Sequence, residues 1–280
     1  MDLWVEERNQ DTHGVMFRVE KVLFRGKSEF QTVEVVETAA HGRMLLNDGL
    51  IMVSERDECV YHEMIAHVPL LSHPDPHRVL VIGGGDGGTV RECLKHPSVE
   101  HVHLVEIDAM VVDACREHIP ATAGCLADPR VKVSIADGVA FVNETTERYD
   151  VVLVDSTDPV GMAAPLFGPE FYGDVARVLT DEGIVVSQCE NPWYEAEAQR
   201  ALLDILRDVF EVTEIYNYHN LTYPGGLWSF SFASKGPRPA KAPDAQRVDA
   251  LGQLKWWTPA LQQACFALPA FQRRALGLAD

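Results

Sequence analysis

The sequence has no long apolar run, few cysteines and little positive charge. No apolar stretch approaches the roughly 18 residues of a membrane-spanning helix, so we expect no membrane protein. The six cysteines form no Cys-x-x-Cys pair and show no metal-ligand spacing to histidine, which predicts reduced core residues and no metal site. The N-terminal residues MDLWVEERNQ are acidic and lack an apolar segment, which predicts no signal or transit peptide and a cytoplasmic protein.

Basic residues are scarce: 24 Lys and Arg stand against 42 Asp and Glu, a formal net charge of −18. Such a surface repels the phosphates of nucleic acids and anionic lipid headgroups, and it attracts cations. We therefore expect a positive or neutral partner, with no nucleic acid and no membrane. General solubility explains the charge equally well when the charge is considered alone.

The chain of 280 residues exceeds the usual size of one domain, so we expect a large domain and a smaller one. Polar and apolar residues alternate in 15–23 and 31–37, and turn sequences occur at 41–43 and 47–49. This pattern predicts a small N-terminal antiparallel β-domain at 1–53. Because so small a sheet covers little apolar surface, it should pack on the rest of the chain or on a second copy.

The remainder, 54–280, has the pattern of a doubly wound α/β domain with a C-terminal helical tail. After a helical segment at 57–71 and an apolar strand at 78–82, continuously apolar strands alternate with helices, which is typical of a parallel sheet buried on both faces. The next expected strands are 101–106, 131–135, 150–154 and 183–189, and the expected helices are 89–95, 109–118, 170–179 and 195–209.

The final two expected strands, 211–218 and 227–233, are too close in sequence for a crossover helix, so they should pair antiparallel. A doubly wound sheet with an antiparallel last strand is the Rossmann-like arrangement of class I methyltransferases. Beyond it, 235–247 has the composition of a linker, and the tail with Trp256 and Trp257 should pack back on the body.

A glycine-rich loop, Gly83-Gly84-Gly85-Asp86-Gly87-Gly88, follows the first apolar strand and opens a helix. It matches GxGxxG in the required context, and glycine lets a backbone turn sharply and approach a ligand closely. A tight turn without a ligand is the alternative. The context favours a nucleotide-type site that includes Gly83 and Gly85.

Acidic residues follow the next two strands. Glu106 stands about 20 residues after the glycine loop, where an acidic side chain meets a ribose diol, so it is the expected ribose ligand. Asp108 should cap the following helix. Asp137, with Gly138, has two interpretations, an acceptor for an adenine amine or an ordinary helix cap.

Asp155 and Asp158 follow a fourth strand, at the same edge of the sheet as Asp86. Three carboxylates in one crevice repel each other by several kcal/mol when they lose water without compensating charge. The crevice therefore needs a cation, either a metal ion or an ammonium ligand. Because the cluster lacks the histidines and the regular oxygen spacing of a metal loop, we favour an amine.

Together, motifs in order over nearly the whole chain resemble spermidine synthase, a polyamine aminopropyltransferase. These motifs are ERDE at 55–58, YHEM at 61–64, GGGDGG at 83–88, EID at 106–108, ADG at 136–138, VVLVDSTDP at 151–159 and TYPGG at 222–226. The resemblance implies transfer of an aminopropyl group from decarboxylated S-adenosylmethionine to putrescine or a related di- or polyamine, giving spermidine and methylthioadenosine. It implies a co-substrate and no metal, and a homodimer or a tetramer.

The resemblance also implies individual roles. The residues implied to act on the amine are Asp155 as proton acceptor, Asp158, Asp86, Tyr61, His62 and Tyr223. The residues implied to hold the cofactor are Gln31, Gly83, Gly85, Asp86, Glu106, Asp137 and Gly138. An amine with a pKa of about 10 is protonated at neutral pH, so a carboxylate must take its proton before it can attack. Asp86 would repel the carboxylate of ordinary S-adenosylmethionine and attract the ammonium of the decarboxylated form.

Two positions depart from the family pattern. Met162 stands where many members have proline, which puts 159–167 in question as a cofactor contact, and Met52 stands where some have glutamine. The alternatives are an S-adenosylmethionine-dependent diamine N-methyltransferase and a non-catalytic polyamine-binding protein. His101 and His103 share one strand face, but with no acidic partner expected nearby, we predict a structural role for them.

Overall fold

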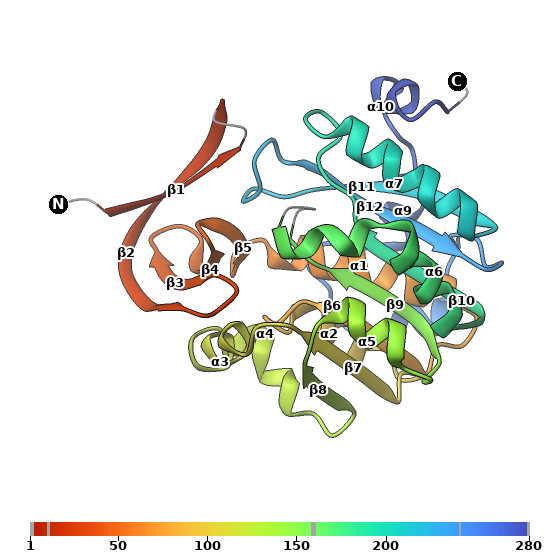
Figure 1. Ribbon diagram of the computed structural model, residues 1–280, viewed down its shortest axis with the longest axis horizontal. Helices are drawn as coiled ribbons and strands as arrows, with labels where there is room; N and C mark the ends of the chain where they lie inside the picture. The colour runs from red at the N-terminus through yellow and green to blue at the C-terminus, as the bar shows by residue number, and fades with distance from the viewer. Residues whose placement is uncertain (1–2, 10–11, 158–160, 241, 279–280) are drawn as a thin grey trace.

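Figure 1 shows a computed structural model of the chain, which describes residues 3–9, 12–157, 161–240 and 242–278. A β-sheet at the N-terminus (red to orange) lies beside a larger α/β body. The five strands of the N-terminal sheet pair antiparallel in chain order. They are β1 (Leu3–Asn9), β2 (His13–Lys27), β3 (Thr32–Thr38), β4 (Gly42–Asn47) and β5 (Leu50–Ser54).

Both faces of the N-terminal sheet carry buried side chains. Val33, Val35 and Leu45 belong to the same apolar core as the α/β body, which confirms that the sheet packs on the rest of the chain. A separate apolar cluster, with Val36 and Met44 at its centre, covers the other face. The division of the chain after residue 53 remains our proposal.

The body contains a second sheet, in the order β11-β12-β10-β9-β6-β7-β8. Its strands are β6 (Arg78–Gly83), β7 (His101–Glu106), β8 (Val131–Ile135), β9 (Tyr149–Asp155), β10 (Leu179–Gln188), β11 (Val212–His219) and β12 (Leu227–Ser234). β12 runs antiparallel to both of its neighbours, whereas β10, β9, β6, β7 and β8 are parallel. This topology confirms the expected Rossmann-like fold.

Helices cover both faces of this sheet (Figure 1). They are α1 (Glu58–Ser72), α2 (Gly88–Leu94), α3 (Ala109–His118), α4 (Pro120–Ala123), α5 (Gly138–Glu144), α6 (Pro169–Val178), α7 (Ala196–Val209), α8 (Ala245–Ala250), α9 (Pro259–Ala264) and α10 (Ala270–Ala275), with 3-10 turns η1 (Gly124–Ala127) and η2 (Gly161–Phe167). Successive residues of β6 point to opposite faces, so Val79 and Val81 enter one core and Leu80 and Ile82 the other. Among the described residues, no helix is both long and apolar enough to span a bilayer.

Two segments differ from expectation. β10 begins at Leu179 and not at 183, because Leu179 pairs with Tyr149 before a register shift. The expected linker 235–247 runs into α8, whose first turn is capped by the Asp244 side chain. The tail itself packs on α1 as expected, since the Glu63 carboxylate accepts hydrogen bonds from the backbone N–H groups of 255–257.

Candidate active site

A cavity of about 780 Å³ lies where the carboxyl ends of the body's parallel strands face the N-terminal sheet. This volume is in the range that holds small-molecule ligands. Every described residue of the expected site contributes to its wall: Gln31, Tyr61, His62, Gly83, Gly85, Asp86, Glu106, Asp137, Gly138, Asp155 and Tyr223. Asp158, the other expected site residue, lies outside the described residues.

The glycine loop lets functional side chains lie directly against its backbone. Gly84 has a φ of +68°, and a Cβ there would lie 2.6 Å from Oδ2 of Asp155. A Cβ on Gly88 would lie 2.1 Å from Cε1 of His62. Since real Cβ contacts are never this short, the loop leaves space for the carboxylate and the imidazole as well as for a ligand.

Asp155 ends β9 directly beside Gly83 of β6 and is half-buried. The Thr89 hydroxyl donates a 2.6 Å hydrogen bond to Oδ2 of Asp155, and the Tyr61 hydroxyl donates a second hydrogen bond to the same carboxylate. Enclosure in the protein and the nearby Asp86 raise the pKa of Asp155. A carboxyl group with a raised pKa is a stronger proton acceptor than an ordinary aspartate.

His62 lies between the two acidic groups of the crevice and a third carboxylate. Its Nε2 is 3.3 Å from Oδ1 of Asp86, and its Nδ1 is 2.6 Å from Oε2 of Glu58. Burial opposes the charged ring, but Asp86 and Glu58 outweigh burial and raise the pKa of His62 to about 10. The expectation that this cluster lacks a histidine was therefore wrong, because His62 of α1 packs against the acidic loop. The protein itself thus supplies one cation to the crevice.

Glu106 forms part of the cavity wall below the glycine loop. Its carboxylate accepts hydrogen bonds from the backbone N–H groups of Gly85 at 3.2 Å and Asp108 at 3.0 Å. Burial raises the pKa of Glu106 to about 7, an effect that the two backbone hydrogen bonds oppose. Asp137 caps α5 by accepting from the backbone N–H of Val139 at 2.8 Å, so its helix-cap interpretation is confirmed, while the adenine contact stays a prediction.

The N-terminal sheet is joined to the body beside the cavity by hydrogen bonds to Asp108, which we term the Asp108 clasp. The Ser28 hydroxyl and the Gln31 amide donate hydrogen bonds to Oδ2 of Asp108, at 2.7 Å and 3.1 Å. The other carboxylate oxygen of Asp108 caps α3, as expected, by accepting from the backbone N–H of Met110. Gln31 thus enters the cavity from the β-domain, as the resemblance implied.

The two positions that depart from the family pattern lie near the cavity. Met52 lines the cavity, and its carbonyl accepts a 2.7 Å hydrogen bond from the Tyr223 hydroxyl. The side chain of Met162 lies outside the described residues, but Ala163 and Leu166 of η2 line the cavity. The part of η2 that follows Met162 therefore contributes to the wall.

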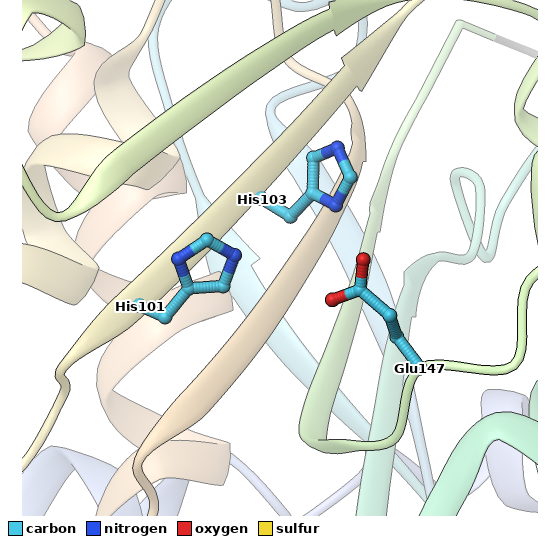
Figure 2. Close-up of side chains that lie close together, drawn as sticks. All are labelled: His101, His103 and Glu147. Carbon is cyan, nitrogen blue, oxygen red and sulfur yellow. The ribbon is translucent and has the colours of Figure 1, made fainter.

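A second cluster of histidine and carboxylate lies at the opposite, amino edge of the sheet (Figure 2). The Glu147 carboxylate points toward the rings of His101 and His103, and one potential ligand atom from each residue lies within 4.8 Å of the others. The expectation that no acidic partner lies near these histidines was wrong. Glu147 was missed because it belongs to the segment before β9, far from β7 in sequence and within no motif.

This amino-edge cluster already has partners within the protein. The ring nitrogens of His103 lie 3.0 Å from the Tyr149 hydroxyl and 2.9 Å from the Ser134 hydroxyl. Glu147 is paired with Arg78, 2.5 Å away, and lies near Lys132. Two neighbouring cations oppose the binding of a third, so these contacts account for the cluster without a ligand.

The fold and the carboxyl-edge cavity place the protein in the class of Rossmann-like transferases. A family model described as Spermine/spermidine synthase domain matches residues 58–242, and one described as Spermidine synthase tetramerisation domain matches residues 3–55. The chain therefore belongs to the spermine/spermidine synthase family. This membership confirms the resemblance noted in the sequence and the expected enzyme class, the aminopropyltransferases.

Individual relatives match this chain over nearly its full length. The chain is 46% identical over 272 residues to a polyamine aminopropyltransferase of Clostridium tetani, covering 97% of this chain and 96% of that protein. A polyamine aminopropyltransferase of Bacillus subtilis is 43% identical over 96% of this chain and 97% of its own. A solved spermidine synthase in complex with the transition-state analogue AdoDATO matches with a TM-score of 0.95 and 38% identity, covering 99% and 96% of the two chains. Spermidine synthase from Thermotoga maritima matches with a TM-score of 0.93 and 37% identity, covering 99% and 95%.

Proposed function

We propose that this chain transfers the aminopropyl group of decarboxylated S-adenosylmethionine to putrescine, giving spermidine and methylthioadenosine. The observation that carries the proposal is the convergence of Asp155, Asp86 and Tyr61 on one cavity in a member of this family. The acidic wall suits a dicationic amine and a cofactor that ends in an ammonium group. The AdoDATO complex of a relative supports the cofactor class.

Asp155 is the proposed proton acceptor. Its raised pKa suits removal of a proton from the attacking ammonium, and hydrogen bonds from Thr89 and Tyr61 hold the carboxylate in place. The freed amine nitrogen forms a bond to the carbon of the aminopropyl group that is attached to the sulfonium sulfur. The carbon–sulfur bond breaks as this bond forms, and the electron pair leaves with sulfur as the neutral thioether methylthioadenosine.

The remaining assignments divide the cavity into two sides. We assign Asp158, Asp86, His62 and Tyr223 to the binding and orientation of the amine groups. We assign Gln31, Gly83, Gly85, Glu106, Asp137 and Gly138 to the cofactor. Asp86 disfavours the carboxylate of ordinary S-adenosylmethionine, which supports the decarboxylated form as the co-substrate. Holding both reactants in line supplies much of the expected rate enhancement.

We further propose that the N-terminal sheet mediates self-association, as a dimer or a tetramer. Large apolar side chains on β1 and β2 are exposed, among them Trp4 at 49% and Met16 at 56%. The family model described as a tetramerisation domain covers this sheet. Light scattering at micromolar concentration should give a mass of two or four chains, and a monomer would contradict the proposal.

Product analysis tests the proposed reaction. Purified protein is incubated with putrescine and either decarboxylated S-adenosylmethionine or S-adenosylmethionine. We expect spermidine and methylthioadenosine from the first mixture and no methylated amine from the second. Methylputrescine from the second mixture alone would favour the methyltransferase, and cofactor binding without either product would favour a non-catalytic protein. Repeating the assay with cadaverine and spermidine ranks the acceptors by length.

A further inference from the structure

A buried ionic network extends behind the cavity from His62 into the body. The Glu58 carboxylate, which faces Nδ1 of His62, also pairs with the Arg91 guanidinium at 2.7 Å and 3.1 Å. The Nε–H of Arg91 donates a 2.8 Å hydrogen bond to Oε1 of Glu92. Glu92 in turn contacts Nε2 of His67 at 3.1 Å, so the network joins α1 to α2 through the protein interior.

The two nitrogens of His62 face two different carboxylates. Nδ1 faces Glu58 of α1, and Nε2 faces Asp86 of the loop between β6 and α2. A neutral imidazole carries one N–H and would turn a lone pair toward one of these carboxylates. Both contacts are favourable only when both ring nitrogens carry protons, so the geometry requires the imidazolium.

Glu58 can serve this role because it is itself held in place. The carboxylate is buried, and two nitrogens of Arg91 bind it in addition to His62. Hydrogen bonds from His62 and Arg91 overcome burial and lower the pKa of Glu58 to about 2. Glu58 is therefore a fixed negative charge at neutral pH.

The two aspartates of the crevice consequently differ in their partners. Asp86 faces a charged N–H of His62, whereas Asp155 receives hydrogen bonds from the neutral hydroxyls of Thr89 and Tyr61. A charged partner stabilises a carboxylate more than a neutral donor does. Two neighbouring acids in different environments can thus take different roles, one as a fixed charge that binds a ligand and one as the proton acceptor.

We propose that Glu58 and Arg91 are positioning residues for the aminopropyl transfer: they hold His62 as an imidazolium directed at Asp86, which gives Asp86 a charged partner and leaves Asp155 to accept the proton. The expected effect on turnover rests on the proposed function, whereas the expected charge of His62 does not. Among the residues that the structure describes, the charged groups that face His62 are Glu58 from α1, Asp86 from the glycine loop and Asp155 from the end of β9. Arg91 of α2 acts on His62 through Glu58.

The charge state of His62 can be measured without turnover. In the full chain with ¹⁵N-labelled histidine, NMR should show both nitrogens of His62 protonated from pH 6 to pH 8, with His62→Gln used to assign the signals. In Glu58→Gln the pKa of His62 should fall by at least about one unit, because one of its two carboxylates is lost. A neutral His62 ring at pH 7 in the wild type, or an unchanged titration in Glu58→Gln, would overturn the proposal.

The pH dependence of kcat gives the second readout, because it reports groups in the bound complex. Glu58→Gln should move the alkaline limb of the kcat profile to lower pH by at least about one unit, as His62 loses its proton earlier, and the loss of kcat should be largest above pH 8. Glu58→Asp retains the charge and should restore much of the wild-type profile. Arg91→Gln removes the group that holds Glu58 but keeps the Glu58 charge, so it should lower kcat by less than Glu58→Gln does.

Glu92→Gln is the matched control. It removes another buried carboxylate from the same guanidinium but does not touch His62, so thermal stability should fall while the alkaline limb stays in place. An equal shift in Glu92→Gln and Glu58→Gln would assign the effect to general disruption of the network and overturn the proposal. If the wild type makes no spermidine, the proposed function fails, whereas the NMR result still tests the state of His62.

Discussion

The same sheet has a cluster of histidine and carboxylate at each of its edges, and the two clusters have opposite properties. At the amino edge His103 is paired with two hydroxyls and Glu147 with a cation of the protein. At the carboxyl edge His62 lies within ligand distance of the carboxylates of Asp86 and Asp155, beside a cavity of about 780 Å³. The clusters are His101, His103 and Glu147 at the amino edge, and His62, Asp86 and Asp155 at the carboxyl edge.

The comparison shows that residue types alone do not identify a site. Both clusters have a histidine and at least one carboxylate within ligand distance. They differ in the charge that remains after internal pairing and in the space beside it. The amino-edge cluster retains no excess negative charge, since Arg78 and Lys132 accompany Glu147. The carboxyl-edge cluster retains excess negative charge next to space for a ligand.

The largest expected effect comes from removing the acid that we assign as the base. Asp155→Asn nearly preserves shape but abolishes proton acceptance, so kcat should fall by at least ~100-fold. Calorimetric titration with methylthioadenosine should give nearly wild-type affinity, which separates chemistry from binding. Wild-type turnover at neutral pH would mean that Asp155 is not the proton acceptor, and the carboxyl edge would lose the catalytic role that distinguishes it from the amino edge.

A smaller effect is expected where the glycine loop meets His62. Gly88→Ala places a methyl group on the His62 ring and should displace the ring from Asp86, lowering kcat by about 10-fold. Gly173→Ala is the control, since a Cβ on Gly173 of α6 meets no atom within 4 Å. Steady-state assays of both variants should separate steric displacement of His62 from a general effect of replacing glycine, and equal activities would contradict the expectation.

The amino-edge cluster should affect stability and not turnover. His103→Leu leaves the hydroxyls of Tyr149 and Ser134 without their ring partner, so the free energy of unfolding should fall by about 1–2 kcal/mol. Urea unfolding measures this change, and kcat should stay within about two-fold of the wild type. A large loss of turnover in a normally folded His103→Leu protein would give the amino edge a role in catalysis.

The last expected effect is a pH dependence of stability, which does not involve turnover. The pKa of His62 is raised to about 10 in the folded chain, so its charge stabilises the fold fully below its ordinary pKa of about 6.5. That contribution is lost as the pH rises toward 10. The difference in unfolding free energy between the wild type and His62→Gln should therefore shrink between pH 7 and pH 10, by about 3 kcal/mol. A constant difference would mean that His62 is not charged.

Most of the fold was predictable because its signals are local. The apolar run at 78–82 followed by glycines predicted β6 and its loop, and the short spacing between β11 and β12 predicted their antiparallel pairing. The start of β10 was misplaced because Leu179 extends the strand across an irregularity that no local pattern marks.

The site was predictable where a residue follows a strand or lies within a motif. Asp155 and Glu106 end β9 and β7, so topology alone places them at the carboxyl edge. Glu58 and His62 are four residues apart on α1, a spacing that could have indicated their contact. Thr89 and Arg91 could not be placed, because their contacts depend on how α2 packs against β9 and α1.

The Asp108 clasp has a consequence for how such chains can be recombined. A single carboxylate begins α3 and anchors the turn between β2 and β3, so one side chain contributes both to a helix of the body and to its contact with the N-terminal sheet. A chimera that takes its first sheet from one relative and its body from another must therefore inherit compatible partners at 28, 31 and 108. The N-terminal sheet and the body form separate sheets, yet they are not interchangeable modules.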